Sequence, residues 1–354
     1  MAEAVRSLNC DITIIGRERS DSCSLDTVPF KTRRFKMFFS KGFLFYGFFN
    51  IRLFIYLLFH KYDLLVSNDL DTLLPNYLVS RLKRIPLVYD SHEFFTEVPE
   101  LQNRTFVKWF WTTIEKTIFP ELKYVMTVSE PIALHYEMLY GIRPLVIRNL
   151  SKNADHISRY SKDELGFPSD DLLLIIQGTG INIDKGSEEL IDALKSNSGI
   201  SLIVVGSGDV VPDLKNRVNK LGISNKVKFF PTVSWEELIS YTKTADIGLC
   251  LEKDTNLNYR YCLPNKLFDY ISAGIPVIAS NLPETSKIII ENDLGLIIES
   301  VTPENISQAI TELKSNPDRL KELRRNAITA SLKFNWEIES KKVIEFYNNV
   351  LICE

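Results

Sequence analysis

Short apolar runs recur along most of the chain, and helix-like stretches separate them. The runs are rich in Val, Ile and Leu on both faces, which is typical of parallel strands buried beneath helices. The predicted strands lie at 11–16, 64–66, 87–89, 124–128, 172–176, 201–205, 227–229, 246–249 and 276–279. The predicted helices include 73–82, 106–119, 187–195 and 212–221. This alternation predicts an α/β fold with doubly wound parallel sheets.

The alternation occurs twice, with a polar segment between the two series. Residues 149–171 interrupt the pattern, so we place a domain boundary there. The chain of 354 residues is long enough for two domains at roughly 150 residues each. Residues 335–351 form a separate amphipathic pattern that predicts a long terminal helix.

The chain starts inside an amphipathic helix, with Ala4, Val5 and Leu8 as its apolar positions, and a strand follows at 11–16. Nucleotide-binding α/β domains normally open with a strand and a Gly-rich turn before their first helix. We therefore expect that the first domain lacks its opening strand. A genuine helical start is the alternative.

Composition narrows the class of protein. The net charge is −3 and 25% of the residues are charged, which disfavours a disordered chain and a protein that binds nucleic acid through its charge. The five cysteines are scattered, and no pair has the spacing of metal ligands. We expect a reduced, cytoplasmic protein.

Residues 31–59 combine basic and aromatic side chains. A basic stretch at 31–36 precedes a strongly apolar run at 42–59. Asn50 and Arg52 in the middle of that run argue against a membrane-spanning helix. Two interpretations remain, a helix buried in the fold or an interfacial surface in peripheral contact with anionic membrane lipid.

Two motifs in the first half contain candidate chemistry. Asp69 and Asp71 form a D-x-D triplet that can hold a divalent cation, although Asp71 can equally cap a helix starting at Thr72. His92 directly follows the strand at 87–89, where ligands of open α/β sheets bind. A histidine there can donate a hydrogen bond to a substrate hydroxyl, or it can be structural.

The densest motif is L-P-N-K-L-F-D-Y-I-S-A-G-I-P-V-I at 263–278. Pro264 suits the start of a helix, and the free N–H groups of Asn265 and Lys266 would then form an anion site. Asp269, one turn further, can accept hydrogen bonds from a ribose diol. Gly274 suits the end of the helix.

A glycine-rich turn supports this assignment. Gln177-Gly178-Thr179-Gly180 ends a predicted strand, and Lys185 lies just before a helix, so both can approach a pyrophosphate. The third glycine of a dinucleotide fingerprint is absent, since Ile183 stands there.

Taken together, these residues resemble a family of enzymes. The run at 263–278 and the two α/β halves resemble GT-B-fold glycosyltransferases, and specifically glycosyltransferase family 4, the retaining group 1 type. The segments 68–75 and 89–101 resemble first-domain motifs of a bacterial branch. The resemblance covers nearly the whole chain. It implies two Rossmann-like domains facing a central cleft. The terminal helix resembles the one that crosses back, so 1–152 plus 335–354 would form the acceptor-side domain and 153–334 the nucleotide-sugar-binding domain.

The resemblance also implies roles for the donor-site residues. Asp269 would bind the donor ribose, although the earlier glutamate with which the wider family pairs it is Tyr261 here. Asn265 and Lys266 would bind pyrophosphate through their backbone.

Gly178 and Lys185 would contact phosphate, but Thr179 stands where an arginine is frequent. Thr232 and Val233 would hold the base through backbone contacts. His92 would lie near the transferred sugar. The family resemblance thus gives His92 and Lys185 as catalytic candidates.

The implied reaction moves a sugar from a nucleotide diphosphate to an acceptor hydroxyl with retention, in the synthesis of surface polysaccharide or glycolipid. It needs no protein nucleophile, no metal and no cofactor beyond the donor substrate. Two other functions remain open: a GT-B nucleotide-sugar epimerase, and a degenerate, non-catalytic glycosyltransferase-like protein.

Overall fold

The computed structural model describes residues 1–18, 29–195 and 197–352, and the chain divides into two compact units. Unit 1 comprises Met1–Arg148 and Ser340–Glu354, and unit 2 comprises Asn149–Glu339. The sequence-based division placed the two boundaries at 152/153 and 334/335. The last helix, α15 (Trp336–Ile352), starts in unit 2 and ends in unit 1.

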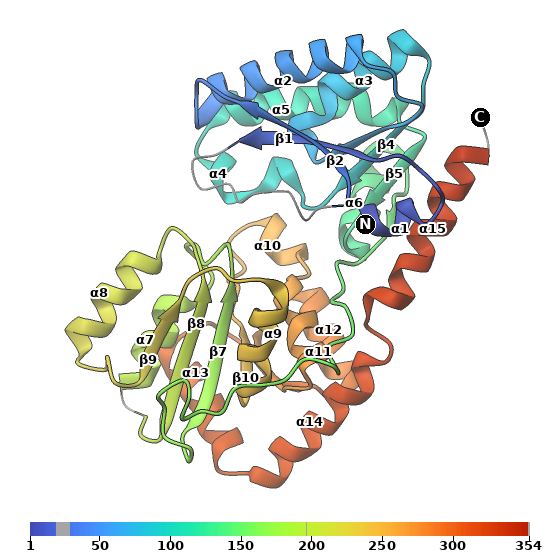
Figure 1. Ribbon diagram of the computed structural model, residues 1–354. Helices are drawn as coiled ribbons and strands as arrows, with labels where there is room; N and C mark the ends of the chain where they lie inside the picture. The colour runs from blue at the N-terminus through green and yellow to red at the C-terminus, as the bar shows by residue number, and fades with distance from the viewer. Residues whose placement is uncertain (19–28, 196, 353–354) are drawn as a thin grey trace. The chain divides into compact units, whose positions relative to one another are not determined.

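Unit 2 is built on one sheet of six parallel strands in the order β12-β11-β10-β7-β8-β9 (Figure 1). Its strands are β7 (Leu172–Gly178), β8 (Ile200–Gly206), β9 (Val227–Phe230), β10 (Ile247–Cys250), β11 (Val277–Ser280) and β12 (Gly295–Ile298). Its helices are α7 (Ser187–Lys195), α8 (Val211–Leu221), α9 (Trp235–Thr244), α10 (Leu257–Tyr261), α11 (Asn265–Ala273), α12 (Pro283–Asn292), α13 (Pro303–Lys314) and α14 (Pro317–Ser331). The predicted strands and helices of this half are all present, and β12 is an addition.

Helices cover both faces of this sheet, which explains the apolar character of its strands. Along β7, Leu172, Leu174 and Ile176 belong to one core with α7, α8 and α13. Leu173 and Ile175 belong to a second core with α9, α11 and α12. Because successive strand residues point to opposite faces, a doubly covered strand must be apolar at every position.

Unit 1 contains two separate parallel sheets within its described residues, of orders β1-β2 and β3-β4-β5-β6. The strands are β1 (Thr13–Glu18), β2 (Lys31–Lys36), β3 (Leu65–Asn68), β4 (Leu87–Ser91), β5 (Tyr124–Thr127) and β6 (Leu145–Val146). The helices are α1 (Ala2–Arg6), α2 (Gly42–Phe59), α3 (Leu73–Lys83), α4 (Pro99–Gln102), α5 (Thr105–Ile118) and α6 (Glu130–Tyr140), with short 3-10 helices η1 (Leu70–Thr72), η2 (Phe95–Glu97) and η3 (Phe119–Glu121).

The start of unit 1 follows the predicted order, with α1 before β1. Strand β2 could not be predicted from the sequence, because it is mostly charged and only Phe35 is buried in it.

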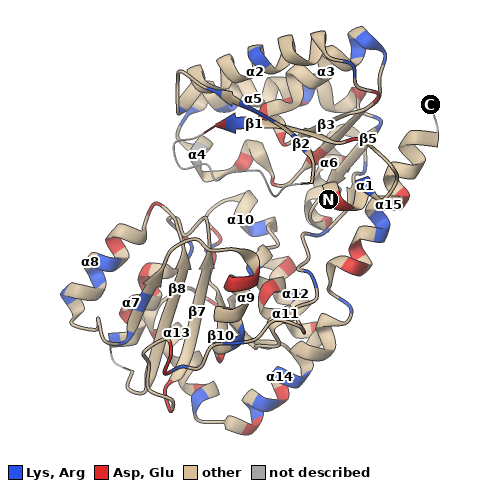
Figure 2. Ribbon diagram, in the orientation of Figure 1, with Lys and Arg blue, Asp and Glu red and all other residues tan. Residues whose placement is uncertain are grey.

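Helix α2 is buried on one side only. Its four buried residues recur every fourth position and so form a single row: Phe45, Phe49, Leu53 and Leu57. Six further apolar residues of α2 are at least 47% exposed. The helix contains no acidic residue and one basic residue, Arg52 (Figure 2). The interpretation of α2 as a buried helix therefore holds for one face alone.

Candidate functional site

The six-stranded sheet of unit 2 reverses its strand order between β7 and β10. From β7 the chain adds β8 and β9 on one side, and then β10, β11 and β12 on the other. Open α/β sheets bind ligands at such a switch point, beyond the carboxyl ends of the strands. The predicted donor-site residues of unit 2 follow the strands β7, β9 and β10.

Two glycine turns meet at this edge of the sheet. Gly178 and Gly206 are paired residues at the ends of β7 and β8, with φ angles of +132° and +127°. The N–H of Ser207 donates to the carbonyl of Gly178 at 3.0 Å. A Cβ at Gly206 would lie 2.0 Å from that carbonyl oxygen, so only glycine allows the two turns to approach so closely.

Lys185 lies above the first of these turns. A Cβ built on Gly180 would be 3.8 Å from the Lys185 Nζ, and the ammonium group lies 5.4 Å from the ring centroid of Tyr259. The backbone N–H of Lys253 donates to the carbonyl of Asp184 at 2.8 Å and ties this loop to the segment after β10. The side chain of Lys185 is half-buried. Its position suits an ammonium group that contacts a phosphate at the switch point.

Helix α11 starts at the same edge, with Pro264 as its N-cap residue. The first N–H groups of a helix, here those of Asn265 and Lys266, have no partner inside the helix and attract anions. The side chain of Lys266 does not point toward solvent, because its ammonium group lies 2.6 Å from Glu252 and is only 10% exposed. Gly274 ends the helix in a left-handed conformation, as predicted.

Glu252 was missed by the sequence analysis, although it is the first charged residue after the apolar strand β10. Its side chain is 2% exposed. Burial favours the neutral acid, but the nearby ammonium groups of Lys266 and Lys185 prevail and hold the pKa of Glu252 below its ordinary value. A buried ion pair thus joins the end of β10 to the first turn of α11.

Asp269 is held by three internal donors. Its Oδ1 accepts from the Ser151 hydroxyl at 2.5 Å and from the Trp235 indole at 3.3 Å. Its Oδ2 accepts from the Gln177 amide at 2.9 Å. Burial raises the pKa of this carboxyl. The ribose-binding role of Asp269 stays a prediction, and a ribose diol would have to share these oxygens with the internal donors.

Thr232 and Val233 lie in the loop between β9 and α9. The Thr232 hydroxyl donates to the Ser207 hydroxyl at 3.2 Å, so this loop is linked to the second glycine turn. Val233 is half-buried and packs against the core of unit 2. The loop backbone is therefore held at the same edge of the sheet as the two glycine turns.

In unit 1, His92 lies among carboxylates at the carboxyl ends of β3 and β4. Its backbone N–H donates to Asp69 Oδ1 at 2.8 Å, and its Nε2 lies 3.1 Å from Asp90 Oδ2. The hydrogen bond with Asp90 raises the pKa of His92 to about 8 although burial opposes the shift. At neutral pH this imidazole is mostly protonated and can donate a hydrogen bond.

The structure tests one of the two sequence-based interpretations of Asp69 and Asp71, the helix cap. Asp69 has a φ of +57°, a strained conformation for a residue that is not glycine. Asp71 lies inside η1, and α3 begins at Leu73 without a side-chain cap, so the helix-capping prediction for Asp71 is wrong. Burial, with Asp69 and Glu93 nearby, raises the pKa of Asp71 to about 7. Among the described residues, no group of three His, Cys, Asp or Glu is arranged to hold a metal ion.

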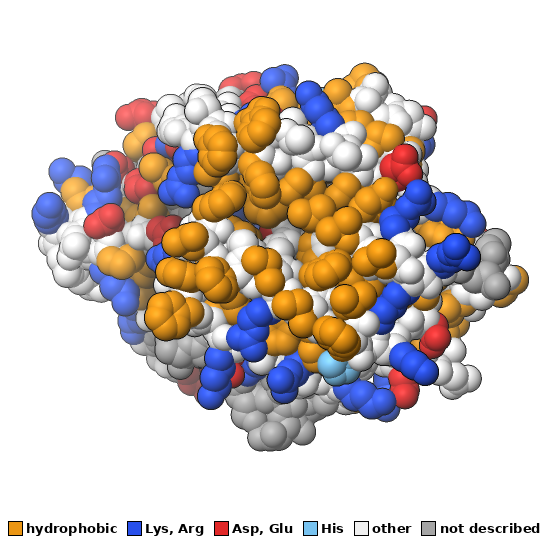
Figure 3. Space-filling model, turned by 90° about the horizontal axis from the view of Figure 1, so that it is seen from above, with side chains coloured by type: hydrophobic (Ala, Val, Ile, Leu, Met, Phe, Trp, Pro, Cys, Tyr) orange, Lys and Arg blue, Asp and Glu red, His pale blue; other side chains and the backbone are white. Residues whose placement is uncertain are grey.

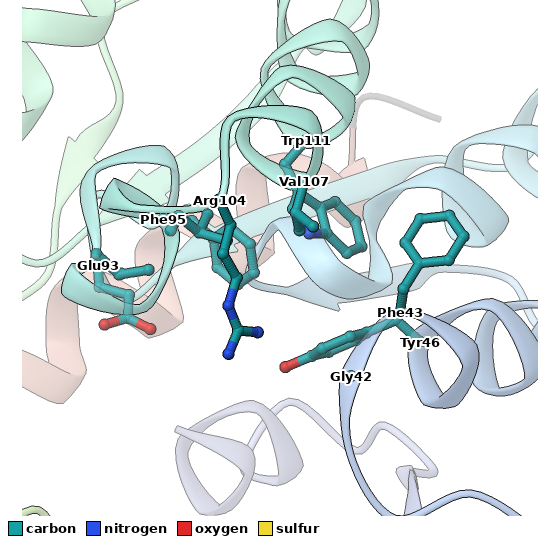
Figure 4. Close-up of a pocket in the computed structure, with 10 residues that line it drawn as sticks. Gly42, Phe43, Tyr46, Glu93, Phe95, Arg104, Val107 and Trp111 are labelled. Atoms are coloured by element: carbon teal, nitrogen blue, oxygen red, sulfur yellow. The ribbon is translucent and has the colours of Figure 1, made fainter.

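A cavity of about 390 Å³ opens beside this cluster, between α2, α5 and the segment around η2 (Figure 4). Its walls are mostly apolar and aromatic, and include Phe43, Tyr46, Phe95 and Trp111. In Figure 4 the guanidinium group of Arg104 points into the opening between the side chains of Glu93 and Tyr46. The cavity extends from Glu93, the residue after His92, to Gly42 and Phe43 at the start of α2.

Comparison with protein families covers both units. The family described as "Glycosyltransferase Family 4" matches residues 1–149, and "Glycosyl transferases group 1" matches residues 159–330. The chain belongs to the group 1 glycosyltransferases. Its fold is GT-B, with two Rossmann-like domains, as the sequence resemblance implied.

Individual relatives of this glycosyltransferase share low sequence identity with it. A GDP-mannose-dependent alpha-(1-6)-phosphatidylinositol monomannoside mannosyltransferase of Mycobacterium tuberculosis is 25% identical over 171 residues, 46% of this chain and 44% of that protein. The chain therefore matches less than half the length of this curated relative.

Two solved structures share the fold across nearly the whole chain. Anabaena HepE, in complex with UDP and glucose, is 16% identical, with a TM-score of 0.75 over 96% of this chain and 100% of that chain. WaaG, a glycosyltransferase involved in lipopolysaccharide biosynthesis, is 16% identical, with a TM-score of 0.76 over 97% of this chain and 93% of that chain.

Proposed function

We propose that this chain transfers a sugar, with retention, from a nucleotide diphosphate sugar to a hydroxyl of a saccharide or lipid-linked acceptor. The observation that carries the proposal is the convergence of two glycine turns, Lys185 and the start of α11 at the switch point of the unit 2 sheet. Together they offer an ammonium group and free backbone N–H groups to a diphosphate. The mannosyltransferase uses GDP-mannose and HepE was solved with UDP and glucose, and both observations agree with such a donor.

In the proposed reaction, the bond between the anomeric carbon and the β-phosphate oxygen breaks as the acceptor oxygen attacks the same face. The acceptor proton passes to the leaving diphosphate. Lys185 and the N–H groups of Asn265 and Lys266 stabilise the charge that develops there. Protonated His92 donates a hydrogen bond to a hydroxyl of the transferred sugar and orients it. No step requires a metal, so we expect transfer to persist in the presence of a chelator.

The setting of the reaction is also a proposal. We place it in the synthesis of cell-surface polysaccharide or glycolipid, on the cytoplasmic side of the membrane. The cavity between α2 and α5 supports an acceptor with an apolar part, because its walls are largely aromatic. Cys10, Cys250 and Cys262 are free thiols, as a reducing compartment favours.

Calorimetric titration of the full chain with UDP, GDP, ADP and CMP tests the donor site. We expect one diphosphate to bind, and Lys185→Ala to weaken it about tenfold or more, since charge-assisted bonds to phosphate are strong. Lys220→Ala, at an exposed lysine of α8, is the matched control and should bind like the wild type. Asp269→Ala should also lose binding. Because Asp269 is buried, this substitution can disturb the fold as well, so Lys185→Ala is the decisive variant.

The results of this titration and of a product assay distinguish a transferase from a non-catalytic protein and from an epimerase. Binding of no nucleotide, or equal binding by Lys185→Ala and the control, would contradict the donor site and favour a non-catalytic protein. If a nucleotide binds, incubation with its sugar donors and analysis of products distinguishes a glycosylated acceptor from an isomerised sugar. The latter result would identify an epimerase.

A further inference from the structure

The outward surface of unit 1 has a continuous apolar face over α2 and α5, here called the α2–α5 face. On α2, the residues Phe43, Leu44, Phe48, Ile51, Ile55 and Phe59 are between 47% and 79% exposed. On α5, Phe106 and Trp109 are 63% and 61% exposed. Figure 3 shows such side chains gathered over one face of the molecule. A helix on the surface of a soluble domain normally presents polar residues outward, so this face is unusual.

Aromatic contacts join the two helices into one face. The ring of Phe43 lies 6.3 Å from Phe106 and 5.3 Å from Phe110, measured between centroids. Phe38, which is 92% exposed, makes an edge contact with the ring of Phe39, and Phe39 contacts Phe48. The face therefore extends beyond residues 31–59 of the sequence-based prediction and includes α5.

The segment 31–61 carries charge of one sign, and two of its lysines, Lys31 and Lys36, lie near Asp11 and Glu18. Between residues 31 and 61 the chain has no Asp or Glu, and its basic residues are Lys31, Arg33, Arg34, Lys36, Lys41, Arg52 and Lys61. Figure 3 shows mostly Lys and Arg side chains, with a few acidic ones, along the border of the apolar area. An apolar face bordered by cations complements a bilayer with anionic headgroups, whereas a protein partner would need acidic groups matched to each of these positions.

The inward contacts of α2 indicate that the helix lies along a surface. It is long and apolar enough to cross a membrane, with a mean hydropathy of 1.6. However, the Asn50 amide donates to the carbonyls of Tyr46 and Asp71 at 2.8 and 2.9 Å, and Phe49 contacts Phe35 of β2. One side of α2 is thus bound to its own unit, which leaves the other side for lipid.

We propose that the α2–α5 face is a membrane-docking surface, which seats unit 1 on an anionic bilayer with Phe106 and Trp109 inserted among the lipids. This inference deepens the proposed function and rests on it for the membrane-borne acceptor. The cavity beside Phe43 then brings the apolar part of such an acceptor from the bilayer toward His92.

Vesicle flotation of the full chain tests the proposal and needs no nucleotide. We expect binding to phosphatidylcholine vesicles that contain roughly one third phosphatidylglycerol, and much weaker binding to phosphatidylcholine alone. Phe106→Ser/Trp109→Ser should reduce binding about tenfold or more. Lys36→Glu/Lys41→Glu should remove the preference for anionic vesicles. Ile290→Ser/Leu332→Ser, at residues of unit 2 that are 68% and 64% exposed, is the matched control.

The readouts keep the two proposals separate. Each variant is also compared with the wild type by circular dichroism and urea unfolding, and unchanged results show an intact fold. Titration with the nucleotide that the wild type binds then reports on the donor site of unit 2 alone. Failure of the wild type to float, or equal flotation of the Phe106/Trp109 variant and the control, would overturn the membrane surface whatever the nucleotide result. A dimer that Phe106→Ser/Trp109→Ser converts to monomers, with no vesicle binding, would instead assign the face to a second copy of the chain.

Discussion

The His92 cluster combines backbone strain with several carboxylates that lie close together. Asp69 is held in a strained backbone conformation close to Asp90, and Asp71 has a raised pKa with Asp69 and Glu93 nearby. Such strain and crowding of like charges cost free energy, and they are typical of functional sites. A protonated His92 offsets part of this cost, because its charge is opposite to that of its neighbours.

We predict that His92 titrates near pH 8 and that Asp90→Asn lowers its pKa toward the ordinary value of 6.5, because the hydrogen bond with Asp90 is the largest cause of the shift. NMR of the histidine imidazoles measures both values. His135, whose pKa burial lowers, is the internal control and should not change. A His92 pKa that is the same in both proteins would contradict the assignment.

The His92–Asp90 pair should also make the free energy of unfolding depend on pH. His92 has a folded-state pKa above its unfolded value, so its contribution is fully present below about pH 6.5 and is lost as the pH rises through about 8. Asp90→Asn should therefore lower the free energy of unfolding more at pH 6 than at pH 9. Urea unfolding at the two pH values measures this difference.

At the residue level, the sequence predicted positions better than contacts. His92 and Lys185 were selected as candidates because they follow apolar strands, and the carboxyl ends of parallel strands are where ligands bind. Their roles stay predictions. The partners of Asp269 were not found, since Ser151 and Gln177 lie 118 and 92 residues away along the chain. No local pattern encodes which side chains the fold brings to that carboxylate.

Among the elements, the strands of unit 2 were predictable because each is apolar on both faces. Strand β2 was not predictable, because only Phe35 is buried in it and its own sequence pattern is mostly charged. It forms through its pairing with β1 and its contact with α2. Helix α11 was predicted in full from Pro264 and Gly274. The ion pair Glu252–Lys266, which joins α11 to the end of β10, was not predicted, since it depends on how the two elements pack.

We predict that this buried pair positions the start of α11. Glu252→Ala leaves the Lys266 ammonium group buried without its partner, which should cost about 3–5 kcal/mol of unfolding free energy. The double variant Glu252→Gln/Lys266→Met removes both charges and should be close to the wild type. Urea unfolding gives the values, and Glu312→Ala on the exposed side of α13 is the control. An equal, small loss in Glu252→Ala and the control would show that the pair has no such role.

On the scale of the whole molecule, the two units have separate sheets and unit 2 has its own pair of cores. The sequence predicted this division from the polar segment after residue 149, because an α/β unit ends where its alternation of strand and helix stops. It could not predict that the described residues of unit 1 form two sheets, since strand pairing depends on contacts between distant segments.

This division leads to a prediction about where a ligand acts. A nucleoside diphosphate held by the turns at 178–186 and by the start of α11 stabilises those segments by mass action, and their amide hydrogens should exchange more slowly. Strands β3 and β4 belong to the other unit and should be unchanged. Hydrogen exchange with mass spectrometry, on the full chain with and without the nucleotide that binds in calorimetry, measures both regions. Lys185→Ala should lose the protection at 178–186. Equal protection of β4 and of the unit 2 turns would mean that the nucleotide binds elsewhere or that its effect is global, and the donor site at the switch point would be wrong.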